Sequence, residues 1–121
     1  MIPDPLLMLA LRLDERRRQF PEGTVCACGE DRAIVLVGGT KPTCCYECDR
    51  ERRGLSRCEE HHLGGRPSPI PPVWIPGNLH RVLSDLQEVF WRDGIVPGSP
   101  EAAWFDLVAL LVVGRVWFAK D

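Results

Sequence analysis

The chain has 121 residues and a formal net charge of −2, with 45% apolar and 26% charged residues. This composition excludes wholesale disorder, and the length leaves room for one globular domain. The small negative charge excludes a strong attraction of the whole molecule to nucleic acid or to an anionic membrane. Thirteen of the fifteen basic residues are arginine, so any phosphate contact is expected from local arginine groups.

The first element predicted along the chain is a helix over residues 1–20, with Asp4 as its N-cap and Pro5 at the first helical position. Its apolar residues 6–11 precede the arginines at 16–18, which is the reverse of a secretory signal. The longest apolar run elsewhere, 107–114, is far shorter than the roughly 20 residues that a membrane span needs. The sequence therefore predicts an intracellular, cytoplasmic protein with no membrane segment.

Residues 24–57 are predicted to form a zinc-ribbon-like segment of short strands and turns, ending in a charged turn or helix start at 49–54. Five prolines between 67 and 76 indicate an extended loop or edge strand. Apolar residues then recur at intervals of three and four, which predicts a helix from Asn78 to about Asp93.

A last helix is predicted over 99–118, with Ser99 as N-cap and Pro100 as the first helical residue. Apolar residues occupy nearly all of its circumference, so it should be buried in its own fold or against a partner. We expect dimerisation, or docking of a protein partner, through this helix. The tryptophans are expected in the core or at an interface. The predicted fold class is a single small α+β domain.

Six cysteines in so short an intracellular chain indicate a metal site rather than disulfides. Cys26 and Cys28 form one close pair, and Cys45 and Cys48 form a second, with strand-forming residues between the pairs. This spacing predicts a structural zinc with four thiolate ligands. Cys44 is an alternative to Cys45, and buried thiols without metal, or a redox pair, are the competing interpretations.

All three histidines lie within 20 residues of one another, at 61, 62 and 80. Neighbouring histidines on an extended strand point to opposite faces, so His61 and His62 offer one imidazole to each side. His80 lies at the start of a predicted helix, where a phosphate is favoured. A divalent cation held by one histidine from each segment, with the third free to deprotonate water, would hydrolyse phosphodiesters. The competing interpretation is a set of ordinary hydrogen-bonded side chains.

Two stretches, Glu60 to Arg66 and Pro76 to Gln87, resemble the core of the HNH (His-Me finger, ββα-metal) endonucleases. The resemblance covers about residues 24–93 and implies a ββα core over 58–93. It implies His62 as the general base, with Asn78 orienting it. It further implies one divalent cation, Mg²⁺, Mn²⁺, Ni²⁺ or Zn²⁺, on His61 and His80. Near the phosphate we expect Arg66 and Arg81.

The sequence departs from that family at its usual zinc clamp. Pro76 and Leu79 occupy the places of the second cysteine pair, so Cys26, Cys28, Cys45 and Cys48 would form a relocated clamp upstream. Cys58 is left open as a core thiol, a fifth ligand or an alternative member of the zinc set. The predicted function is metal-dependent hydrolysis of nucleic acid, with DNA as the expected partner. The alternative is a non-catalytic zinc-binding module that binds nucleic acid or a protein.

Overall fold

The computed structural model describes residues 4–119 of the chain. Its first helix, α1 (Pro5–Arg17), begins as predicted, because the Asp4 carboxylate accepts the backbone N–H groups of Leu6 and Leu7. The helix ends at Arg17, three residues earlier than expected. Residues 1–3 of the predicted helix lie outside the described residues.

The cysteine-bearing segment is a small module of short elements. It contains η1 (Ala33–Val35), β1 (Leu36–Val37), β2 (Cys44–Cys45) and α2 (Tyr46–Arg52). The two strands pair antiparallel, with Leu36 opposite Cys45. The apolar run at 34–37, predicted as a strand, is half 3₁₀ helix, because a backbone hydrogen bond from Val35 to the Arg32 carbonyl closes a turn there.

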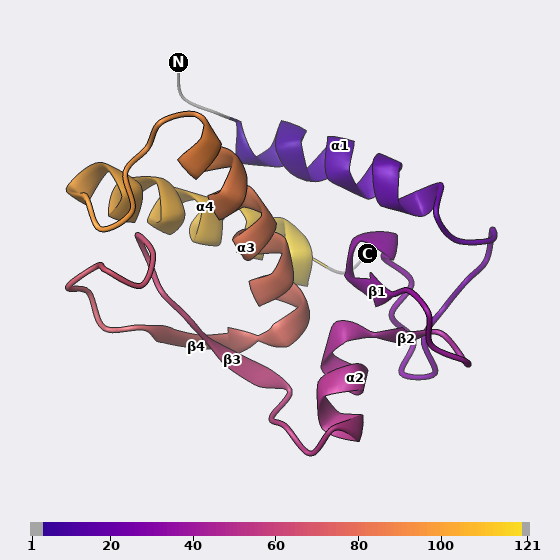
Figure 1. Cartoon of the computed structure of the whole chain (residues 1–121). Helices are drawn as coiled ribbons and strands as arrows, with labels where there is room; N and C mark the ends of the chain where they lie inside the picture. The colour runs from indigo at the N-terminus through magenta and orange to yellow at the C-terminus, as the bar shows by residue number, and fades with distance from the viewer. Residues whose placement is uncertain (1–3, 120–121) are drawn as a thin grey trace.

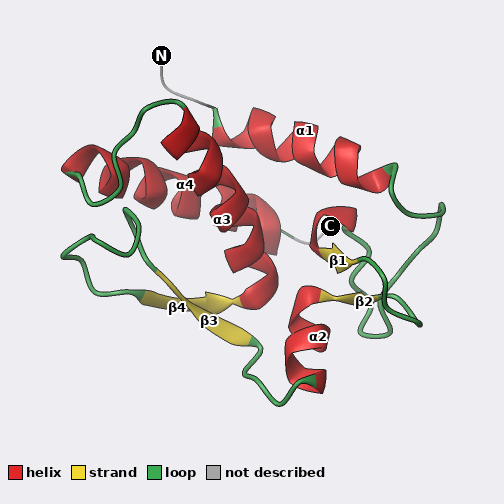
Figure 2. Cartoon of the chain, viewed as in Figure 1, coloured by secondary structure: helices red, strands yellow, loops and turns green. Residues whose placement is uncertain are grey.

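A second antiparallel hairpin leads directly into a long helix. Strand β3 (Cys58–His61) pairs with β4 (Val73–Pro76), so that Cys58 lies opposite Pro76 and His61 opposite Val73. Helix α3 (Gly77–Arg92) follows β4 without a break, one residue before the predicted start. The order β3–β4–α3 is the strand–strand–helix order expected for residues 58–93, and the proline-rich stretch forms the loop and the second strand (Figure 2).

The last helix, α4 (Pro100–Phe118), has the predicted bounds, and the Ser99 hydroxyl accepts the Ala102 N–H at its start. Only one face of α4 is buried in the chain's own fold. That face packs into the main core through Ala102, Phe105, Ala109, Val113 and Trp117. The opposite face leaves Trp104, Leu111 and Phe118 exposed.

Helix α3 occupies the middle of the fold (Figure 1). Its buried residues Leu79, Leu83, Leu86 and Phe90 form the main core together with α1 and α4, and its first turn touches β3, β4 and α2. The β3–β4 hairpin and α2 therefore lie at the N-terminal end of α3. No helix in the described part of the chain is long and apolar enough to cross a membrane.

Gly77 joins β4 to α3 at a point with no room for a side chain. Its N–H donates to the Arg57 carbonyl at 2.7 Å, and a Cβ at this position would lie 2.8 Å from the same oxygen. We expect Gly77→Ala to lower the free energy of unfolding by about 2 kcal/mol, because backbone atoms must move. Gly38→Ala, with nothing within 4 Å of its Cβ, should change it by less than ~0.5 kcal/mol. Urea denaturation measures both, and equal effects would contradict the packing argument.

Candidate functional site

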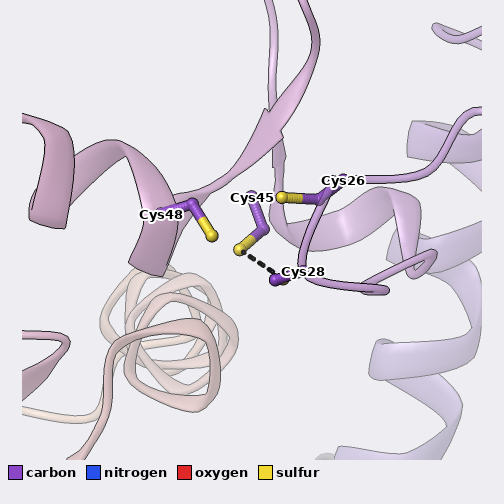
Figure 3. A group of neighbouring side chains, drawn as sticks. All are labelled: Cys26, Cys28, Cys45 and Cys48. Atoms are coloured by element: carbon purple, nitrogen blue, oxygen red, sulfur yellow. Dashed lines mark hydrogen bonds between the residues drawn. The ribbon is translucent and has the colours of Figure 1, made fainter.

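The structure brings four cysteines from two segments together (Figure 3). Cys26 and Cys28 lie on the turn before η1, whereas Cys45 and Cys48 lie at the start of α2. The four sulfur atoms all lie within 4.8 Å of one another, and the Sγ atoms of Cys28 and Cys45 are 3.7 Å apart. Among the described residues, this is the one cluster of three or more potential ligand groups that can hold a metal ion.

The cluster fits a tetrahedral zinc ion. Zinc–sulfur bonds of about 2.3 Å place neighbouring thiolates about 3.8 Å apart, close to the observed Cys28–Cys45 distance. Three of the four side chains are withdrawn from solvent, since Cys26 and Cys45 are buried and Cys48 is half-buried, whereas Cys28 is exposed. Four protein ligands leave no open position, so the geometry is that of a structural site rather than a catalytic one.

Hydrogen-bond donors surround the thiols. Burial raises the pKa of Cys26, but backbone groups of Cys28 and Cys45 outweigh it and lower the pKa to about 7. Burial raises the pKa of Cys48, while Arg57 acts in the opposite direction by placing its guanidinium 3.5 Å from that sulfur. A divalent cation with four thiolates carries two net negative charges, which Arg57 partly offsets.

The structure distinguishes the two remaining cysteines from the cluster. The Cys44 thiol lies 3.7 Å from the Thr40 hydroxyl, and Cys45, its neighbour, supplies the sulfur to the cluster. Cys58 is exposed on β3. Geometry therefore assigns Cys45 rather than Cys44 to the cluster, because consecutive residues on β2 point to opposite sides, and it places Cys58 outside the cluster.

Asn78 lies on the cysteine side of α3. Its amide oxygen accepts the Glu47 N–H at 2.9 Å, and its amide nitrogen is 3.4 Å from the Glu30 carboxylate. The expected role of Asn78 in orienting His62 would require its side chain to lie near His62, in the pocket that His62 and His80 line, but Asn78 does not line that pocket. The reason is helical geometry, since Asn78 and His80 are about 200° apart around the axis of α3.

The histidines lie at a second site, a pocket of about 470 Å³ between the hairpin and α3. His62 and His80 both line it, and His61 lies directly behind. The pocket carries charges of both signs and one exposed aromatic ring. Its lining residues are Arg50, Glu59, Glu60, His62, Gly65, Arg66, Trp74, His80, Ser84 and Gln87.

His61 is buried against His80 and is only 1% exposed. The two rings meet edge to face with centroids 5.3 Å apart, and neither ring nitrogen of His61 has a hydrogen-bond partner among the described residues. Burial, followed by the nearby His80 and His62, lowers the pKa of His61 to about 4. His61 is therefore neutral at pH 7 and has a buried lone pair without a partner, which is costly unless something binds it.

His80 has partners on both ring nitrogens. Its Nδ1 lies 3.1 Å from the Glu59 carboxylate, and its Nε2 lies 3.4 Å from the Ser84 hydroxyl. Burial lowers the pKa of His80, although Glu59 acts to raise it. Glu59 and His61 are two residues apart on β3 and so share the face that packs on α3. Glu59 thus belongs to this site, and no spacing pattern along the chain marks it in advance.

A buried network fixes the turn that follows His62. The Gln87 amide donates both to the His62 carbonyl at 2.9 Å and to the Asp106 carboxylate at 2.7 Å. Asp106 lies on α4, is 2% exposed, and also accepts the Gly64 N–H at 2.5 Å. Burial raises the pKa of Asp106, although its hydrogen bonds with Gln87 and Gly64 act to lower it. Helices α3 and α4 therefore both hold the backbone beside His62.

The two arginines predicted to contact phosphate lie in different places. Arg66 lines the histidine pocket. Arg81 lies over the ring of Tyr46, with its guanidinium carbon 5.3 Å from the ring centroid, and does not line the pocket. The pocket instead contains Arg50, whose Nη1 is 3.5 Å from Glu59. Trp74 is 65% exposed at the pocket, so of the two places expected for the tryptophans, the core or an interface, it does not occupy the core.

The cysteine cluster predicts the zinc content of single variants. We expect about one zinc per chain in the parent protein and its loss in Cys48→Ser, because three thiolates hold the ion far more weakly than four. Cys44→Ser and Cys58→Ser are the matched controls and should keep the zinc. Elemental analysis of purified protein measures the content. Zinc retained in Cys48→Ser, or lost equally in Cys44→Ser, would contradict the assigned ligand set.

Burial of His61 predicts a pH-dependent stability. Its pKa falls from 6.5 to about 4 on folding, so between these values the unfolded chain binds more protons. The contribution of His61 to the free energy of unfolding is therefore complete above pH 6.5. It falls by about 3 kcal/mol as the pH drops to 4. Urea denaturation of His61→Leu should show a correspondingly smaller fall, and His62→Ala should retain the parent's fall. Because the thiols titrate in all three proteins, the differences report His61, and parallel curves would refute the effect.

Comparison with known proteins does not indicate a function, so a functional proposal has to rest on the geometry of the two sites. No protein-family model, no curated protein and no solved structure matches this chain. The resemblance of residues 58–87 to the HNH endonucleases therefore stays an expectation from sequence. The structure itself establishes a small α+β domain with a cysteine cluster that can hold a metal ion.

Proposed function

We propose that the chain is a metal-dependent nuclease that hydrolyses phosphodiester bonds of nucleic acid in the histidine pocket, with a structural zinc ion in the cysteine cluster. The observation that carries the proposal is His61, whose buried ring nitrogens have no partner among the described residues although His80 and the pocket lie beside it. The strand–strand–helix order of β3, β4 and α3 also supports it, since this is the order expected from the resemblance.

The donor chemistry suits a divalent cation. The proposed donors are the imidazoles of His61 and His80, with the Glu59 carboxylate beside them on β3. In the structure the Nδ1 atom of His80 pairs with Glu59, and Arg50 lies 3.5 Å from the Oε1 atom of Glu59, so a cation would bind here only by displacing these contacts. Nitrogen and oxygen donors of this kind bind Mn²⁺, Ni²⁺ or Zn²⁺, and the carboxylate also suits Mg²⁺. When bound, the cation would supply positive charge that stabilises the negative charge developing on the phosphate.

His62 is the proposed general base. It lines the pocket and is only partly buried, so an imidazole nitrogen can accept a proton from water. The water oxygen then forms a bond to phosphorus, the bond to the leaving oxygen breaks, and that oxygen takes up a proton from solvent. The hydrogen bond from Gln87 to the His62 carbonyl keeps the backbone of the base in place during this step.

Arg66 and Trp74 are the proposed substrate contacts. Arg66 forms no ion pair with a described residue, so its guanidinium is available to a phosphate, whereas Arg50 is already paired with Glu59. The exposed Trp74 ring offers a face for a nucleobase. With a net charge of −2, non-specific affinity for DNA should be weak and strongly reduced by salt.

Nicking of plasmid DNA tests the proposal. With Mg²⁺ or Mn²⁺ the zinc-loaded protein should cut, and excess EDTA should stop it. His62→Ala should reduce the rate by about 100-fold or more, because the base is lost. Arg66→Ala should reduce it by about tenfold, whereas Arg81→Ala, the matched arginine outside the pocket, should leave it nearly unchanged.

Two outcomes would overturn this assignment. If His62→Ala cuts as fast as the parent protein, His62 is not the base. If no divalent metal supports cutting although an oligonucleotide binds and Arg66→Ala weakens that binding, the chain is a non-catalytic binding module. Circular dichroism of each variant establishes that it is folded before its activity is compared.

A further inference from the structure

The outward face of α4 carries an apolar stripe with a charge near each end. Its exposed residues include Trp104 at 61%, Leu111 at 64% and Phe118 at 57%. Val108 lies between them and is partly buried. This face points away from the buried face of α4, which contributes Ala109 and other residues to the core. The chain leaves an unusually apolar helix face in contact with water.

The spacing of the stripe is that of a helix-pairing seam. Its members follow one another at intervals of three and four residues, as in a coiled coil. Such a repeat keeps side chains on one line along a helix over several turns, so that they can pack against a second helix. The members are Glu101, Trp104, Val108, Leu111, Arg115 and Phe118.

The two charges make the stripe complementary to itself. Glu101 and Arg115 are both exposed, and neither forms an ion pair within the described part of the chain. They lie equally far from Val108, on either side of it along the helix. Two copies of α4 that cross antiparallel at Val108 therefore place Glu101 of each copy opposite Arg115 of the other, which gives two ion pairs per dimer. A parallel arrangement would place like charges together.

We propose that the chain forms a two-fold symmetric dimer in which α4 packs antiparallel against α4 of a second copy. The apolar residues supply the burial and the Glu101–Arg115 pairs set the direction. A single helix pair lies at the lower end of interface sizes, so the dissociation constant should be micromolar. The proposal concerns a different face from the histidine pocket and does not depend on nuclease activity.

Sedimentation equilibrium of the full-length, zinc-loaded chain between about 1 and about 100 µM tests association. The parent should pass from monomer to dimer in this range. Leu111→Glu should remain monomeric, because dimerisation would bury one unpaired carboxylate from each copy between the two helices. The matched control is Leu7→Glu on α1, an exposed leucine at 56% against 64% for Leu111, which should dimerise like the parent. Circular dichroism verifies that both variants are folded.

Charge reversal tests the direction of pairing. Arg115→Glu should weaken dimerisation by about tenfold, and Glu101→Arg in addition should restore most of it. Either single change also alters the helix-dipole interaction within one chain, but that affects monomer stability and not the association constant. A parent that is monomeric throughout, or a dimer lost in Leu7→Glu and kept in Leu111→Glu, overturns the proposal. A dimer unaffected by Arg115→Glu overturns its antiparallel arrangement.

Discussion

The reciprocal hydrogen bonds between Glu47 and Asn78 join the two halves of the molecule. The Glu47 N–H donates to the Asn78 side chain at 2.9 Å, and the Asn78 N–H donates to the Glu47 carboxylate at 3.0 Å. The N-cap residues of both helices, Cys45 and Pro76, make no side-chain cap of their own. Each helix therefore depends on a side chain of the other to satisfy an N–H of its first turn.

This exchange links the cysteine cluster to the histidine pocket. Cys45 is the N-cap of α2 and Cys48 lies in its first turn, while Asn78 and His80 lie in the first turn of α3. An ion that fixes the cysteines fixes α2, and the Glu47–Asn78 contact passes that constraint to the turn carrying His80. A cluster with no open coordination position can thus matter to a pocket in which none of its ligands takes part.

Local chemistry explains which features were predictable from sequence. Asp4 and Ser99 cap their helices as predicted, because capping needs only a short polar side chain and the next few residues. The cysteine pairs converge as their spacing indicated.

Long-range pairing was not predictable: Asp106 accepts a hydrogen bond from Gly64, 42 residues earlier, and no local pattern marks this contact. The contact of Asn78 with Glu47 was likewise not predictable, because the resemblance gave Asn78 a role but not the partners of its side chain. The single apolar face left exposed on α4 also depends on what packs against the helix.

Arg32 ties the end of α4 to the cysteine-bearing turn. Its guanidinium lies 3.3 Å from the centre of the Trp117 ring and donates to the Trp117 carbonyl, a contact that spans 85 residues. The same arginine binds Glu30, which contacts Asn78. During synthesis, the turn that holds Cys26 and Cys28 therefore lacks this support until the last turn of α4 has left the ribosome. Loss of the last turn of α4 would therefore loosen a turn that lies about 85 residues earlier in the chain.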